Sequence, residues 1–210
     1  MPKQEVLPAD WSPLEIKLLN TVDIFLHKPA IMKKVEGNLT ALKQEIIKTL
    51  SQSPHPCPPN SDITKGQIVR GENHKGFPFM SLDMPQMFSK SEMFTYRTLF
   101  WWGHDLIFSL ILKQQNQTKL IEKLVGLKNH PEWKDIQLAL APTPWEWGKD
   151  KNNFITLSET SAMEIKNSIS SIQYIKLCRF YSLTTPEFQK LNWTSAGLAS
   201  WKTLSTVCID

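Results

Sequence analysis

The feature that most constrains the fold is a pair of apolar segments separated by two residues. Residues 93–102 and 105–112 alternate between two kinds of side chain and are rich in aromatic and β-branched residues, which is typical of β-strands. Gly103 is the first residue of the intervening loop, the position where a type II′ turn requires glycine. The sequence therefore predicts an antiparallel hairpin in which Trp102 lies opposite Asp105.

This register gives the predicted hairpin two different faces. The first is expected to be the core side and carries Leu99, Trp101, Leu106, Phe108, Leu110 and Leu112 together with Arg97. The second mixes apolar with polar residues and carries Tyr96, Phe100, Trp102, Ile107 and Ile111 with Thr98, Ser109 and Asp105. Because this mixed face is too apolar for open water and too polar for a plain core, we expect a helix to cover it or a cavity to lie against it.

Helical patterns occur on both sides of the hairpin. Residues 12–15 have the order Ser-Pro-Leu-Glu of a capping box, and apolar residues follow at helical spacing as far as Phe25. A second pattern covers residues 39–50, and four prolines within residues 53–60 end it. Further helices are expected over residues 117–127, from Ser161 to Ile175, and after Thr185.

Short strands are expected at residues 67–70, 79–82, 136–140 and 154–157 in addition to the hairpin. The predicted fold class is α+β: an antiparallel β-meander of about five strands with helices from both termini packed on one face. We expect a single domain, residues 1–210. Its expected parts are a helical prelude (12–52), a proline-rich connection (53–60), and the sheet with its remaining helices (61–210).

One segment resembles a known family. The segment starts with Arg70-Gly71-Glu72-Asn73-His74-Lys75-Gly76-Phe77-Pro78-Phe79, continues through Leu82-Asp83-Met84-Pro85 and ends with Arg97-Thr98-Leu99-Phe100-Trp101-Trp102-Gly103. It is similar to a pattern in an uncharacterised family of bacterial hypothetical proteins of unknown function. The resemblance implies a bacterial, cytoplasmic origin, and it implies no activity.

Charge and apolar content argue against two classes of partner. The net charge is +4 with a pI of about 8.9, and the basic residues are scattered, so we expect no nucleic-acid partner. The longest apolar run, residues 106–112, is too short to span a bilayer and no signal peptide is visible, so we expect no membrane partner. The cysteines Cys57, Cys178 and Cys208 form no metal-binding or disulfide pattern, which favours reduced thiols in the cytoplasm.

The sequence also lacks the motifs of the commoner catalytic and cofactor sites. Four candidate metal ligands lie near the hairpin, His74, Asp83, His104 and Asp105, but their spacing matches no known metal-binding pattern. No glycine-rich phosphate loop and no GxSxG segment is present. We therefore expect no metal, no cofactor and no catalytic residue of these kinds.

The aromatic residues at the hairpin end and in one loop carry the functional prediction. Trp102, Trp145 and Trp147 occupy such positions, where indole faces bind planar ligands, sugar rings or a protein partner. We expect a non-enzymatic cytoplasmic domain that binds a small molecule or a protein through the mixed face. The candidate binding residues are His74, Asp83, Arg97, Trp102, Trp145 and Trp147.

Arg97 leaves alternatives open. It is expected to pair with a carboxylate, Glu72 or Asp83, or else to bind an anionic ligand. The alternative function is a small hydrolase-like enzyme that uses His74, Asp83 and Arg97, which requires the three side chains to meet in one pocket.

Overall fold

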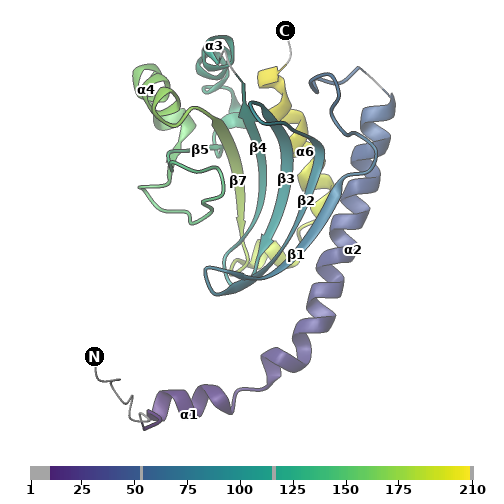
Figure 1. Ribbon diagram of the computed structural model, residues 1–210, viewed down its shortest axis with the longest axis vertical. Helices are drawn as coiled ribbons and strands as arrows, with labels where there is room; N and C mark the ends of the chain where they lie inside the picture. Colours follow the sequence, from purple (N-terminus) through teal and green to yellow (C-terminus); the bar gives the residue numbers. More distant parts are fainter. Residues whose placement is uncertain (1–9, 53, 115–116, 209–210) are drawn as a thin grey trace, which may run out of the picture. The chain divides into compact units, whose positions relative to one another are not determined.

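The computed structural model describes residues 10–52, 54–114 and 117–208. The chain forms two compact units, which divide between Lys34 and Val35. The first unit contains α1 (Pro13–Leu19) and the beginning of α2 (Asp23–Gln52), and the second contains all later elements (Figure 1). Residue 53 of the expected proline-rich connection lies outside the described residues.

Helix α1 begins as its sequence predicts and ends earlier. The Ser12 side chain accepts a hydrogen bond from the amide of Glu15, whose carboxylate accepts one from the Ser12 amide at 2.7 Å. The helix ends at Leu19, and just beyond it the Asn20 side chain donates to the Ile16 carbonyl and the Thr21 hydroxyl donates to the Lys17 carbonyl. The expected single helix reaching Phe25 is therefore wrong, since two helices share this segment.

The second unit is built on a seven-stranded sheet in the order β1-β2-β3-β4-β7-β5-β6. All its pairings are antiparallel, which confirms the α+β class with an antiparallel meander, although the sheet has more strands than the expected five. The strands are β1 (Gln67–His74), β2 (Phe77–Phe88), β3 (Met93–Trp101), β4 (Asp105–Lys113), β5 (Gln137–Ala139), β6 (Phe154–Thr156) and β7 (Ile175–Ser182).

Strand β7 occupies a segment in which the sequence predicted no strand. Helix α4 (Ala162–Ile172) ends at Gln173, which has the left-handed φ of 60°, so the expected continuation of this helix to Ile175 is wrong. In β7 two charged residues, Lys176 and Arg179, interrupt the apolar pattern although both are buried. Arg179 is held by two hydrogen bonds to the Asp135 carboxylate, and this pairing is invisible in the sequence.

The predicted hairpin is present in a register shifted by one residue. Phe100 lies opposite Leu106, whereas the expected loop would place it opposite Ile107. The loop has three residues because the His104 amide donates to the Trp101 carbonyl at 3.1 Å. Gly103 has φ +76°, so its expected left-handed conformation is confirmed. It is, however, the third residue of the four-residue turn from Trp101 to His104, whereas the expected type II′ turn places glycine second.

The shifted register reassigns the residues to the two faces of the sheet, because side chains alternate along a strand. Arg97 lies opposite Ser109 and does not share a face with Leu110 and Leu112 as expected. The face packed by helices, called here the helix-covered face, carries Phe94, Tyr96, Phe100, Leu106, Phe108 and Leu110. The other, called the loop-covered face, carries Arg97, Leu99, Trp101, Ile107, Ser109 and Ile111.

The helix-covered face packs against α6 (Trp193–Leu204) and residues 35–52 of α2. In Figure 1, α6 lies behind the central strands. The Tyr96 hydroxyl donates to the Gly197 carbonyl at 2.6 Å, and the Trp201 ring contacts Tyr96. Gly197 also lies next to Leu42 of α2. This face is therefore mainly apolar, and the buried Arg179, which lies opposite Phe108 and donates to the Ser200 hydroxyl of α6, is its charged residue on β7.

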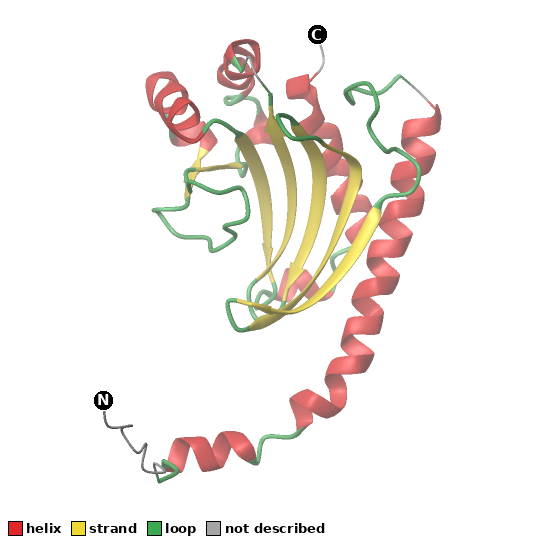
Figure 2. Ribbon diagram, in the orientation of Figure 1, coloured by secondary structure: helices red, strands yellow, loops and turns green. Residues whose placement is uncertain are grey.

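Short helices complete the second unit around the ends of the sheet (Figure 2). They are α3 (Thr118–Leu127), α5 (Pro186–Gln189) and the 3₁₀ helices η1 (Pro131–Trp133), η2 (Leu157–Glu159) and η3 (Ser205–Cys208). Among the described residues, no helix combines the length and the apolar character that crossing a bilayer demands.

Candidate ligand-binding site

The loop between β5 and β6 covers the loop-covered face of the sheet. Three hydrogen bonds from β7 and the residue before it hold the first half of the loop. The Tyr174 hydroxyl donates to the Ala141 carbonyl at 2.5 Å, and the Lys176 amino group donates to the carbonyls of Pro144 and Glu146 at 2.9 and 2.6 Å. The expected mixed face does not exist as one surface, because the shifted register places Tyr96 and Phe100 on the helix-covered face and Ile107 and Ile111 on the other. The loop-covered face is covered by neither the expected helix nor a cavity, but by a loop whose backbone is fixed to the sheet.

Lys176 is a charged residue in the interior of this assembly. It is fully buried, and its Nζ atom lies 3.3 Å from the centroid of the Trp147 ring. Burial lowers the pKa of Lys176 to about 8, because removing an ammonium group from water disfavours its charged form. The two carbonyls and the indole face compensate part of this desolvation.

A salt bridge holds the same loop at its other side. The Lys75 amino group, in the turn between β1 and β2, lies 2.6 and 2.7 Å from the two carboxylate oxygens of Glu146. Burial raises the pKa of Glu146, but the Lys75 hydrogen bond and the amides of Gly148 and Trp147 outweigh it, so the pKa lies below its ordinary value. The loop is therefore fixed at both sides.

Arg97 and Asp83 form a second polar group under the loop. The Arg97 Nε and Nη2 atoms donate to the two Asp83 oxygens at 2.8 and 2.7 Å, and the Thr95 hydroxyl donates to Asp83 at 2.8 Å. The expected carboxylate partner of Arg97 is confirmed as Asp83, while Glu72 pairs with Arg70. The Arg97 guanidinium carbon lies 4.6 Å from the Trp145 ring centroid. The guanidinium, held in place by Asp83, therefore makes a cation–π contact with this indole.

Trp145 stands at a cleft of about 290 Å³, called here the Trp145 cleft. It remains 40% exposed although its backbone is fixed. The end of β2, where Phe88 is also exposed, and the turn between β2 and β3 line the same cleft. Besides Trp145, the residues that line the cleft include Phe88, Lys90, Glu92, Met93, Lys113 and Tyr174.

The structure brings four of the six predicted site residues together. Asp83 and Arg97 are joined directly, and the Arg97 guanidinium faces both Trp145 and Trp147. Trp147 is buried in the apolar cluster of the loop-covered face. Trp102 lies apart from them, because its ring contacts Phe100, which belongs to the helix-covered face.

His74 is not brought to the Asp83–Arg97 pair. It lies opposite Phe77 on the β1–β2 ladder, and the six residues from Phe77 to Asp83 span about 20 Å of extended strand. Its ring contacts Trp101 and Phe79, and its Nε2 atom has no hydrogen-bond partner among the described residues. Burial lowers the pKa of His74. The three residues of the alternative hydrolase therefore do not share a pocket.

The cleft also contains residues that the sequence did not indicate. Lys90, Lys113 and Phe88 lie on different strands or turns, and their convergence depends on the strand register. Lys176 could have been noticed as a charge inside an apolar segment, had that segment been recognised as a strand. In the described part of the chain, no group of three or more His, Cys, Asp or Glu residues is placed to hold a metal ion.

Comparison of this chain with protein-family models, with curated proteins and with solved structures finds no match. The similarity of residues 70–103 to a bacterial family of unknown function stays a prediction.

Proposed function

We propose that this protein is a non-enzymatic binding domain whose Trp145 cleft takes a small molecule with a flat ring and an acidic group. The observation that carries the proposal is that the Trp145 indole is exposed while three separate contacts hold it and the backbone next to it. Arg97 lies against the Trp145 ring, while Lys176 and the Lys75–Glu146 pair hold the flanking backbone. Fixing an aromatic surface in advance lowers the entropic cost of binding.

The chemistry of the walls supports the ligand class. Trp145 and Phe88 both line the cleft and both offer exposed aromatic surface, which favours a flat ring. Lys90 and Lys113 place two ammonium groups at the walls, against the one carboxylate of Glu92, so an acidic substituent is favoured. A volume of about 290 Å³ matches the low end of small-molecule sites.

The cellular setting belongs to the same proposal. We place the protein in the cytoplasm, and the free thiols of Cys57, Cys178 and Cys208 support this location.

The test uses naphthalene-1-sulfonate, which combines a flat ring with an anionic group. Saturation-transfer NMR on the full chain should show saturable binding of this probe. Trp145→Ala should weaken binding by about fivefold to about 150-fold, because stacking on one indole contributes about 1–3 kcal/mol in comparable sites. Lys113→Met should weaken it by a smaller factor, and both should leave the folded structure intact, since both side chains lie at the surface of the cleft.

The matched control is Trp11→Ala, which removes another exposed tryptophan from the other unit. Binding should be unchanged in this variant. Naphthalene, which lacks the sulfonate, should bind more weakly than the probe. The proposal is wrong if Trp145→Ala and Trp11→Ala bind the probe equally, or if naphthalene and the sulfonate bind alike.

A further inference from the structure

Strand β6 is one of the two edge strands of the sheet, β1 being the other, and one of its sides pairs with no further strand among the described residues. On its paired side, Ile155 lies opposite Leu138, and the flanking bonds join Asn153 to Leu140 and Leu157 to Ile136. Backbone groups of successive residues in an antiparallel strand point to opposite sides. The N–H and C=O groups of Phe154 and Thr156 therefore point to the free edge.

Two of these four edge groups are already bonded within the chain. The Phe154 amide donates to the Asp150 carbonyl at 2.9 Å, and the Thr160 hydroxyl donates to the Thr156 carbonyl at 2.7 Å. The Phe154 carbonyl and the Thr156 amide have no partner among the described residues. The free edge thus offers one acceptor, the Phe154 carbonyl, and one donor, the Thr156 amide, on either side of Ile155. The next group on each side, the Phe154 amide and the Thr156 carbonyl, is already hydrogen-bonded.

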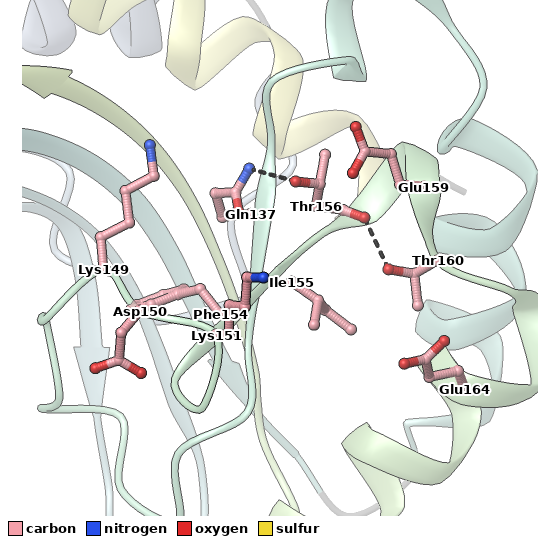
Figure 3. Close-up of a pocket in the computed structure, with 10 residues that line it drawn as sticks. All are labelled: Gln137, Lys149, Asp150, Lys151, Phe154, Ile155, Thr156, Glu159, Thr160 and Glu164. Atoms are coloured by element: carbon pink, nitrogen blue, oxygen red, sulfur yellow. Dashed lines mark hydrogen bonds between the residues drawn. The ribbon is translucent and has the colours of Figure 1, made fainter.

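A cleft of about 490 Å³, called here the β6 cleft, lies along this opening. Figure 3 shows Lys149 and Asp150 on one side of β6, and Glu159 and Glu164 on the other. Lys151 also precedes the strand and lines the cleft. The Asp150 carboxylate accepts hydrogen bonds from the Asn152 and Asn153 amides and from the Asn153 side chain. The end before β6 therefore offers the ammonium groups of Lys149, which also lies 5.2 Å from the Phe180 ring centroid, and of Lys151, and the end after it offers carboxylates.

We propose that the β6 cleft binds a tripeptide with free termini, lying antiparallel to β6. The carbonyl of its first residue accepts from the Thr156 amide, its second residue lies opposite Ile155, and the amide of its third residue donates to the Phe154 carbonyl. In this direction the peptide's ammonium group reaches the Glu159 and Glu164 end. Its carboxylate reaches the Lys149 and Lys151 end. The parallel direction places like charges together at both ends.

The closed positions on the edge argue for a peptide of this length. A longer strand, or β6 of a second copy, needs the Phe154 amide and the Thr156 carbonyl for the next pair of hydrogen bonds, and Asp150 and Thr160 occupy them. A tripeptide needs neither bond, because its chain ends at these two positions. Three extended residues measure about 10 Å, and their bulk fits a cleft of about 490 Å³.

The test is a titration of the ¹⁵N-labelled full chain with trialanine, followed by NMR. Trialanine should shift the amide proton of Thr156 downfield in a saturable way, since this amide gains a hydrogen bond. Acetylating the amino end or amidating the carboxyl end should each weaken binding at least about tenfold, as expected when one charged hydrogen-bonded partner is lost.

Two double variants connect each peptide end to its side chains. Glu159→Gln with Glu164→Gln should weaken binding of free trialanine and abolish the difference between free and acetylated peptide. Lys149→Met with Lys151→Met should abolish the difference between free and amidated peptide. The matched controls, Glu187→Gln and Lys190→Met, change exposed residues of the same charges near α5 and should leave all three affinities unchanged.

Three results would overturn this proposal. The first is a Thr156 amide that does not respond to trialanine. The second is equal binding of the free and both capped peptides. The third is light scattering that shows a dimer dissociated by Thr156→Pro, because it would mean that a second copy occupies the edge. These results do not bear on the Trp145 cleft, which lies on other residues.

Discussion

Arg97 and Asp83 lie directly opposite each other on β3 and β2, and two parallel hydrogen bonds of 2.8 and 2.7 Å join the guanidinium to the carboxylate. The Asp83 side chain is 2% exposed and that of Arg97 is 18% exposed. The arrangement is bidentate, which fixes the guanidinium plane. The pair thereby supports the Trp145 ring above it as well as compensating its own burial.

Removing the cation from this pair should destabilise the fold strongly. Arg97→Ala leaves the buried Asp83 carboxylate without its partner, and we expect the free energy of unfolding to fall by about 3 kcal/mol or more. Chemical denaturation measures this. Arg70→Ala is the control, because the Arg70–Glu72 pair is about half exposed, and its loss should cost less than about 1 kcal/mol. Equal midpoints for the two variants would contradict the expected role of burial.

Gly103 should be sensitive to substitution through its backbone alone. Its φ is +76°, and a Cβ atom there would meet Phe77 at an ordinary contact distance of 3.5 Å. We therefore expect Gly103→Ala to cost about 1 kcal/mol, measured by urea denaturation. Gly103→Asn should cost less, because asparagine tolerates the left-handed region better than alanine. An alanine variant as stable as the natural protein would refute the strain.

The position of Gly103 also shows how far the sequence could determine the hairpin. The glycine between the two segments and the alternation of side chains along them correctly predicted two strands and a turn residue with positive φ. The same sequence is compatible with a loop of two residues and with a loop of three residues. Which loop length forms depends on the hydrogen bond from the His104 amide to the Trp101 carbonyl. That single bond changes the face on which every residue of β4 lies relative to β3.

The candidate site was predictable in the same partial way. Trp145 stands out in the sequence because an aromatic residue in a proline-rich loop is unusual, and Arg97 stands out because residues 93–102 contain no other Lys, Arg, Asp or Glu. The residues that hold them could not be found, because Lys176 reads as a solvent-exposed residue until β7 is placed inside the sheet. Contacts such as Lys75 with Glu146 join residues far apart in sequence, and no local pattern encodes them.

Gly197 should be required for packing although it lies within helix α6. A Cβ atom there would lie 2.6 Å from Leu42 and 3.0 Å from Phe108, and both side chains are fully buried. Overpacking of this kind costs about 1–3 kcal/mol, which exceeds the gain of up to about 1 kcal/mol from replacing a helical glycine by alanine. We expect Gly197→Ala to lower the urea midpoint.

Helix α2 supplies the matched control for Gly197. At Gly37 a new Cβ atom meets nothing within 4 Å, so Gly37→Ala should raise the urea midpoint by helix propensity alone. The packing argument fails if both alanine variants shift the midpoint in the same direction.

Lys176 should make the stability depend on pH in the alkaline range. Burial lowers its pKa from 10.5 in the unfolded chain to about 8 in the fold, so between these values the unfolded chain binds more protons and the fold gains stability as pH rises. Compared with Lys176→Met, the natural protein should gain up to about 3 kcal/mol between pH 8 and 10.5, and show no relative change from pH 6 to 7. Burial raises the pKa of the Cys178 thiol to about 12, which gives the opposite slope. This contribution is present in both proteins, so only the part that depends on the Lys176 charge, which lowers the Cys178 pKa, remains in the difference. Urea denaturation of both proteins at pH 7 and 9.5 measures the effect, and a constant difference between them would show that Lys176 keeps its ordinary pKa.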